Sequence, residues 1–271
     1  MKFLMVKQMF RTCLTSKILL AVFFIFSLVI FNESAVFAVT VKDILRKMDQ
    51  LQKLEEDVTA KVNIVQQDVE QGKKVMQSIY FAKDTSDLFL IVLTAPESEK
   101  GNGYLKIAKN FWMYRRNTRT FQHVSRDESI AGSDANASDF EAPKYEKHYK
   151  AILAPNGSEI IESTMLGKVP VYKVEIISQI VEVDYPKKIL WVRKDNFLPL
   201  KEQSFSLSGT LMKTQYFLKY SQVDHKYIPV KQLVIDEFEK GNKTLWEITD
   251  ISFKPIAESV FTKAYLENLS K

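Results

Sequence analysis

Hydrophobic positions follow two successive periods in the first part of the chain. From Val41 to Leu54, apolar residues recur at helical spacing and gather on one face. Residues 58–64 then alternate apolar and polar side chains, and Val75–Phe81 repeats this pattern after a polar turn that contains Gly72. The change of period predicts an amphipathic helix followed by a β-hairpin.

Short strand patterns separated by turn residues fill most of the remaining chain. Asp87–Thr94 is apolar on both faces, which is typical of a strand that is covered on both sides. Arg126–Pro143 interrupts the series as a long polar loop, and Ser259–Leu269 has the pattern of a last short helix. The other predicted strands are Gly103–Ala108, Phe111–Arg115, Thr120–Val124, Tyr145–Leu153, Ile160–Thr164, Val169–Ile177, Lys188–Arg193, Leu200–Ser206, Thr210–Leu218, Lys226–Asp236 and Lys243–Ile251.

This long series of strands, with helices mainly at its two ends, indicates a mainly β protein. Neighbouring strands of such a meander pair antiparallel, and a sheet of this size must curl or split. We therefore expect a single curved antiparallel sheet that forms a half-open barrel with a few covering helices. The Val41–Leu54 helix should lie against its concave side.

The N-terminal segment has the three parts of a cleavable secretory signal peptide. Basic residues precede the uncharged apolar run Ile18–Phe31, and Val36 and Ala38 suit the positions before a cleavage site. The alternative is a retained membrane anchor, but this run spans only about 21 Å as a helix, short of a membrane core of roughly 30 Å. We expect residues 1–38 to be a signal peptide and residues 39–271 to be one exported, periplasmic β domain, which can also associate with a membrane.

Residue types that carry catalysis or bind metals show no recognisable spacing. The three histidines are far apart, the only cysteine is Cys13, and no Walker, dinucleotide-binding or nucleophile-elbow motif is present. The formal charge is +5, of which the predicted signal peptide supplies +3, so nothing favours nucleic acid as a partner. We expect no catalytic residue, no metal site and no cofactor.

Two further features allow alternative interpretations. Arg115, Arg116, Arg119 and Arg126 precede the polar loop, where they can meet an anionic head group or pair with the acids of the loop. Those acids suit either acid–base chemistry or the capping of turns. The many aromatic residues on predicted strands indicate either an ordinary packed core or an apolar cavity on the concave face.

Between Leu93 and Phe140 the chain carries an ordered set of motifs. An apolar strand ends in a proline and precedes Lys-Gly and Tyr-Leu; a strand with Trp, Tyr and Arg-Arg comes next, and Gly-Ser-Asp with a second Asp follows. These residues are Pro96, Lys100, Gly101, Tyr104, Leu105, Trp112, Tyr114, Arg115, Arg116, Gly132, Ser133, Asp134 and Asp139. With a later hairpin pattern at Lys188–Leu200, the chain resembles the outer-membrane lipoprotein-sorting (LolA-like) family over about residues 56–253.

The resemblance implies an unclosed β-barrel plugged by helices, with an apolar interior that receives acyl chains. In a strand, alternate side chains point to opposite faces, so only some residues of Asp87–Thr94 point inward. The sequence does not fix which alternate set this is, because both faces of the strand are apolar. We expect three groups of site residues: Leu90, Val92, Trp112 and Tyr114 line the cavity; Arg115, Arg116 and Arg119 hold a head group at its rim; Gly132, Ser133, Asp134 and Asp139 belong to a lid loop.

The function that this interpretation favours is a periplasmic, non-enzymatic carrier for a lipid or a lipoprotein acyl chain, of the outer-membrane lipoprotein-sorting type. Its partners would be the lipid or acylated lipoprotein, together with an inner-membrane transporter or an outer-membrane acceptor. One alternative is an envelope regulatory or sensor module of the same fold that controls a membrane partner. Others are a lipid hydrolase and a structural envelope protein with a solid core.

Overall fold

The structure is a computed structural model that describes residues 39–125, 128–130, 132–133, 136, 144–223 and 225–270. The predicted signal peptide and the predicted lid residues Asp134 and Asp139 lie outside the described residues. The elements described below belong to one compact unit that begins at Thr40.

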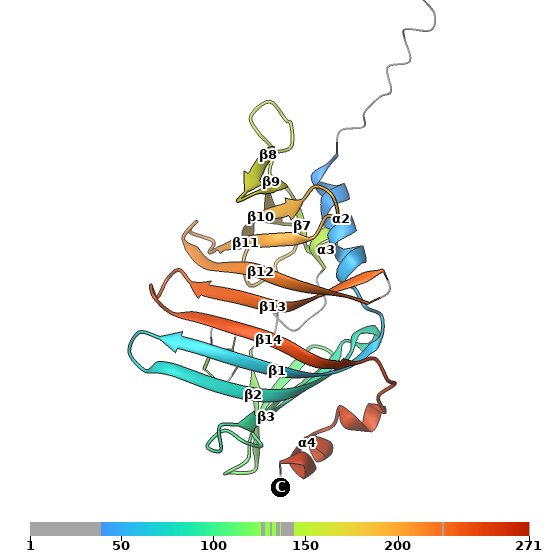
Figure 1. The fold of residues 1–271 in the computed structure, drawn as a ribbon, viewed down its shortest axis with the longest axis vertical. Coiled ribbons are helices and arrows are strands. Elements are labelled where there is room, and N and C mark those ends of the chain that lie inside the picture. Colours follow the sequence, from blue (N-terminus) through green and yellow to red (C-terminus); the bar gives the residue numbers. More distant parts are fainter. Residues whose placement is uncertain are drawn as a thin grey trace, which may run out of the picture. The chain divides into compact units, whose positions relative to one another are not determined.

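Fourteen strands form one antiparallel sheet, which confirms the predicted fold class (Figure 1). Their order is β6-β5-β4-β3-β2-β1-β14-β13-β12-β11-β10-β9-β7, with β8 paired to β9 beside this path. The sheet is therefore open, with β6 at one edge and β7 at the other. The strands are β1 (Asp57–Asp68), β2 (Gly72–Lys83), β3 (Leu88–Ala95), β4 (Gly103–Ile107), β5 (Asn110–Arg115), β6 (Thr120–Val124), β7 (Tyr149–Ala151), β8 (Ile161–Leu166), β9 (Val169–Ser178), β10 (Lys187–Arg193), β11 (Pro199–Phe205), β12 (Leu211–Val223), β13 (Lys226–Asp236) and β14 (Lys243–Ser252).

The predicted amphipathic helix is present as α2 (Val41–Gln52). Thr40 begins it with a capping box, because its hydroxyl accepts a hydrogen bond from the Asp43 N–H at 3.1 Å and the Asp43 side chain accepts one from the Thr40 backbone in return. The apolar face of α2 packs against β13, β7 and the short helix α3 (Tyr145–His148). Its buried residues are Val41, Ile44, Leu45 and Met48.

Two sequence predictions of local structure were wrong in part. The strand predicted at Tyr145–Leu153 begins with the helical turn α3, because Asp49 of α2 accepts hydrogen bonds from the first two N–H groups of that turn. The last helix, α4 (Lys263–Leu269), is shorter than predicted. It starts after a separate 3₁₀ turn (Glu258–Val260), and Thr262 caps it.

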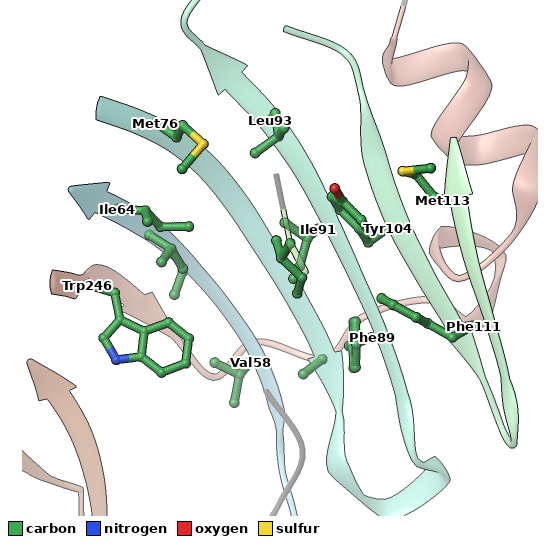
Figure 2. Packing of buried hydrophobic residues seen from close by; sticks show 14 of the residues in the cluster. Val58, Ile64, Met76, Phe89, Ile91, Leu93, Tyr104, Phe111, Met113 and Trp246 are labelled. Atoms are coloured by element: carbon green, nitrogen blue, oxygen red, sulfur yellow. The ribbon is translucent and has the colours of Figure 1, made fainter. Parts of the chain in front are cut away.

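Pairing register gives the sheet two continuous faces, because residues paired across neighbouring strands lie on the same face. We call the inner face the one that carries Ile64, Ile91 and Glu202. The main hydrophobic cluster occupies this face over β1–β6 and β14, where Trp246 packs beside Ile64 (Figure 2). Over β10–β13 the buried residues of the inner face are more polar: they include Glu202, Ser204, Gln215 and Gln232.

The opposite, outer face is covered by the C-terminal segment over β3 and β4. Leu266 of α4 and Phe261 pack there with Leu90 and Leu105, and all four side chains are buried. This arrangement explains why β3 is apolar on both faces. Phe89, Ile91 and Leu93 belong to the inner cluster, whereas Leu88, Leu90 and Val92 lie in or against the cluster beneath α4.

Candidate functional site

A cavity of about 880 Å³ lies where α2 meets the β7 edge of the sheet. One wall is the first turn of α2, and the others come from α3, β7, the end of β9 and the loop that follows β7. Its lining residues are Lys42, Leu45, Glu146, Lys147, Tyr149, Lys150, Ala151, Ile152, Leu153, Glu159, Ile177 and Gln179. The cavity has an apolar lining with charged side chains among it.

Apolar side chains in this cavity remain accessible, in contrast to those of the main cluster. Ile177 at the end of β9 is 41% exposed, and Leu153 after β7 is 58% exposed. Leu45 is buried on the face of α2 that was predicted to contact the sheet. Since β7 has only three residues and lies at the end of the sheet path, none of the described strands covers this group. An apolar ligand could therefore bury surface here without displacing protein atoms.

Polar contacts hold α3 in place as a wall of the cavity. The Asp49 carboxylate accepts hydrogen bonds from the Tyr145 and Glu146 N–H groups, each with a nitrogen–oxygen distance of 2.9 Å. These contacts cap the turn in the manner of an N-terminal acidic residue. Burial nevertheless dominates the titration of Asp49 and raises its pKa from an ordinary value of 3.8 to about 6.

A buried ion pair anchors the same wall to the inner face. The Tyr145 hydroxyl donates to Glu202 at 2.6 Å, and the Lys188 ammonium pairs with the other oxygen of that carboxylate. Burial opposes the charged form of Glu202, but the attraction of Lys188 and the hydrogen bonds from Lys188 and Tyr145 together hold its pKa below the ordinary value. The rings of Tyr145, Tyr149 and Tyr185 also lie 5.7–5.8 Å from the Lys188 nitrogen.

The four residues predicted to line an apolar cavity lie together, but on the outer face. Leu90, Val92 and Tyr114 are buried in the cluster beneath α4, and Trp112 packs against this cluster. The Lys263 ammonium of α4 lies 3.1 Å from the centre of the Trp112 ring. Their ligand-binding role remains a prediction, and the cavity under α2 is made by other residues.

The predicted head-group arginines separate into two groups. Arg116 and Arg119 line a small polar cavity of about 160 Å³ together with Tyr114, Glu267 and Ser270, whereas Arg115 does not contribute to it. This cavity lies next to the C-terminal end of α4, in a different part of the sheet from α2 (Figure 1).

Among the described residues of the predicted lid loop, Gly132 contacts β1. The Gln66 side-chain amide donates to the Gly132 carbonyl at 2.6 Å, and the buried Ser133 hydroxyl donates to the Ile130 carbonyl at 2.7 Å. Ile130 itself belongs to the main hydrophobic cluster. These contacts place Gly132 and Ser133 beside the inner face, while the role of the loop as a lid remains a prediction.

Sequence reasoning missed the cavity because its walls are distant in the chain. Leu45 was recognised as part of an apolar helix face, but nothing in the sequence pairs it with Ile177 or Tyr149. The available signal was the apolar-polar mixture at Tyr149–Leu153, which was assigned to a longer strand.

In the described part of the chain, no three acidic, histidine or cysteine side chains gather as they would around a metal ion. Nor is any described helix long and apolar enough to cross a membrane.

Comparisons with known proteins agree with this fold. A LolA superfamily protein from Nitrosomonas europaea is 21% identical, with a TM-score of 0.69, and the match covers 84% of this chain and 100% of that chain. A domain described as an outer membrane lipoprotein-sorting protein from Vibrio parahaemolyticus is 19% identical, with a TM-score of 0.71 and coverage of 83% and 97%. A DUF1329 family protein from Desulfovibrio piger gives the same identity, TM-score and coverage. At these identities the likeness shows the fold alone.

Sequence comparison assigns the family. No curated protein matches the chain. The model of a family described as "Uncharacterized protein" matches residues 85–268, which is more than half of the sequence. The chain therefore belongs to this family, and its fold is the LolA-like fold that the sequence motifs predicted.

Proposed function

We propose that this protein is an exported, periplasmic carrier that binds the acyl chain of a lipid or of an acylated lipoprotein and catalyses no reaction. The cavity between α2 and the sheet edge carries this proposal, because it combines a volume of about 880 Å³ with accessible apolar side chains. Small-molecule sites in proteins are mostly apolar and span roughly 300–1,000 Å³. The signal-peptide pattern of residues 1–38 supports export.

Burial of an acyl chain supplies enough free energy for such a carrier. Each methylene that leaves water contributes about 0.8 kcal/mol. A 16-carbon chain therefore contributes on the order of 10 kcal/mol before the costs of association are subtracted. Lys42, Lys147 and Lys150 outnumber Glu146 and Glu159 around the same cavity, so they can attract an anionic head group while the chain occupies the apolar part.

The test is a titration with a fluorescent fatty-acid probe, followed by competition with long-chain phospholipids. Ile177→Glu places a charge among the apolar lining residues and should weaken probe binding at least tenfold. Because Ile177 is 41% exposed, the variant should melt like the wild type. The matched control is Leu218→Glu on β12, since Leu218 is 52% exposed and does not line the cavity.

Two outcomes would contradict the proposal. One is the failure of the wild-type protein to bind the probe or any long-chain lipid. The other is an equal loss of binding in Ile177→Glu and Leu218→Glu. Trp112→Ala separates this cavity from the site predicted by sequence: unchanged affinity supports the cavity under α2, and a loss would assign the ligand to the cluster beneath α4 instead.

A further inference from the structure

One end of the sheet carries a row of exposed apolar side chains. Among the residues that the structure describes, the four most exposed large apolar side chains are Val181 at 98%, Leu207 at 91%, Phe238 at 67% and Val69 at 64%. They lie in four different connections between strands, namely β9–β10, β11–β12, β13–β14 and β1–β2. A single exposed apolar side chain is ordinary, but a row of them marks a contact surface.

Strand pairing places these four connections side by side. In this part of the sheet, the ends of β1, β9, β11 and β13 pair with the starts of β2, β10, β12 and β14. Figure 1 shows the β1–β2, β13–β14 and β11–β12 connections on the same side of the sheet. At the opposite end, Leu198 of the β10–β11 connection is buried, and Met165 beside the β8–β9 turn is 55% exposed.

Backbone contacts hold two of these tips in fixed positions. The Val69 N–H donates a hydrogen bond to the Asn242 side-chain oxygen at 2.9 Å, which joins the β1–β2 tip to the β13–β14 tip. A Cβ at Gly241, where φ is +106°, would lie 2.5 Å from Cγ1 of Val69, so this approach needs glycine. The Phe238 N–H donates to the Asp236 carboxylate at 2.8 Å. The exposure of Val69 and Phe238 is therefore part of the fold.

The β11–β12 tip satisfies its own polar groups. The Ser206 and Ser208 hydroxyls form a hydrogen bond at 2.8 Å, and the Ser206 hydroxyl accepts another from the Thr210 N–H at 3.1 Å. The Gly209 N–H donates to the Ser206 carbonyl at 3.0 Å. Residues 206–210 contain no charged side chain. Such a tip can leave bulk water at low cost, because unpaired polar groups and charges are what make this transfer expensive.

The spacing of the row favours a bilayer over a protein partner. Neighbouring strands lie about 4.8 Å apart, so the tips of neighbouring hairpins lie about 10 Å apart. The connections 69–71, 179–186, 206–210 and 237–242 also contain five acidic side chains and one basic side chain, Lys240. The core of a protein interface is packed and depleted of charge. In a fluid head-group layer, by contrast, each tip can bury its apolar side chain independently of the others.

From these observations we infer that the row of Val69, Val181, Leu207 and Phe238 docks the protein on the surface of a zwitterionic lipid bilayer. Polybasic segments attract anionic lipids, whereas the connections that carry this row are mainly acidic. Their carboxylates repel an anionic surface and can meet the ammonium groups of phosphatidylethanolamine or phosphatidylcholine. Burial of the apolar side chains in the head-group region then supplies the affinity.

The row continues from the wall of the cavity under α2. Ile177 and Gln179 line this cavity, and the β9–β10 connection runs from Gln179 to Val181 at the tip. Docking through the row therefore brings the cavity close to a membrane, from which an acyl chain can enter. This link rests on the proposed carrier function, whereas the docking surface itself does not.

The test is flotation of residues 39–271 with phosphatidylcholine vesicles. This range contains the whole compact unit and omits the apolar run Ile18–Phe31, which would bind vesicles by itself. Leu207→Ser combined with Phe238→Ser should weaken vesicle binding about tenfold or more, because two apolar side chains are removed from the row. The matched control combines Met165→Ser with Leu218→Ser, since these side chains are 55% and 52% exposed and lie outside the row. The control should bind like the wild type.

Two further measurements sharpen the test. Addition of phosphatidylglycerol to the vesicles should leave binding unchanged or weaken it, because the tips are acidic. Affinity for the fatty-acid probe should be unchanged in the Leu207→Ser and Phe238→Ser double variant, so a loss of docking is distinguished from a loss of the carrier function.

Three outcomes would overturn the inference. The first is a wild-type protein that does not float with the vesicles, and the second is a control variant that loses as much binding as the tip variant. The third is a wild-type dimer in sedimentation velocity that the tip variant converts to a monomer while vesicles do not bind, which would make the row an interface between two copies of the chain.

Discussion

The two helix-covered regions of the sheet are built in different ways. Over β3 and β4, α4 covers the outer face with apolar side chains that are completely buried, such as Leu90 and Leu266. Near the β7 edge, α2 also buries an apolar face, but its neighbour α3 is held by the Asp49 carboxylate and by the Tyr145–Glu202 hydrogen bond. The larger cavity, of about 880 Å³, lies beside the apolar residues of this second region.

The comparison distinguishes apolar surface that the protein has already buried from apolar surface that a ligand can still bury. Side chains beneath α4 have already gained their hydrophobic free energy within the protein, so a ligand would have to displace α4 to use them. Ile177 and Leu153 remain accessible, and a ligand can cover them at no such cost. The polar contacts of α3 then decide the shape of the cavity wall.

The largest expected effect is the loss of the buried ion pair in the α3 region. Glu202→Gln leaves the Lys188 ammonium buried without its carboxylate and should lower the free energy of unfolding by about 3–5 kcal/mol. Denaturant unfolding measures this change. The matched control is Glu175→Gln, which breaks the more exposed Lys187–Glu175 pair on neighbouring strands and should cost less than about 1 kcal/mol.

A double variant sharpens this prediction. Lys188→Met combined with Glu202→Met removes both charges, so it should recover much of the stability that Glu202→Gln loses. If Glu202→Gln costs as little as Glu175→Gln, charges do not hold the α3 region, and the contrast with α4 disappears.

The second prediction concerns the apolar attachment of α4. Leu266→Ala removes a completely buried side chain and should cost about 3 kcal/mol in unfolding free energy, because it leaves a cavity between α4 and β4. Leu269→Ala in the same helix is the control, since Leu269 is 46% exposed and should change stability by less than about 0.5 kcal/mol. Affinity for the fatty-acid probe should be unchanged in both variants; a tenfold loss in Leu266→Ala would mean that α4 contributes to the lipid site.

Periodicity predicted the strands well because most of them alternate buried and exposed positions. Lys226–Asp236 was predicted with the bounds of β13, and Lys243–Ile251 is one residue shorter than β14. Asp87–Thr94 shows what periodicity does not predict, namely which face of a strand is the inner one. Its pattern predicted coverage on both faces, but the choice between Leu90 and Ile91 as the inner residue depends on α4, far away in the sequence.

The candidate sites depended on contacts that the sequence does not encode locally. Tyr145–His148 became a helical turn because Asp49 caps it, although the local residues suit a strand. The motif with Gly101 was recognised, but its physical reason became clear only from the contacts that Gly101 and Gly103 make with Arg116 and Leu266. The periodicity of hydrophobic residues therefore predicted the sheet, whereas the placement of the helices determined which side chains face a cavity.

The smallest expected effect is a pH dependence in the α3 region. Burial raises the pKa of Asp49 to about 6, above the ordinary value of 3.8 that applies in the unfolded chain. The folded protein thus binds this proton more tightly than the unfolded chain, so the associated stability is fully present below about pH 4 and is lost as the pH rises through 6. The loss should be on the order of 2–3 kcal/mol between pH 4 and pH 7.

Asp49→Asn isolates this contribution from the titration of all other groups. Its side-chain oxygen can still accept a hydrogen bond from α3, but it carries no proton that is lost in this range. The difference in unfolding free energy between wild type and Asp49→Asn should therefore shift in favour of the variant as the pH rises from 4 to 7. Because Asp49 positions a wall of the cavity whereas Leu266 packs among apolar side chains, Leu266→Ala should show the wild-type pH profile. A difference that stays constant with pH would mean that the two N–H hydrogen bonds outweigh burial and keep Asp49 ionised throughout.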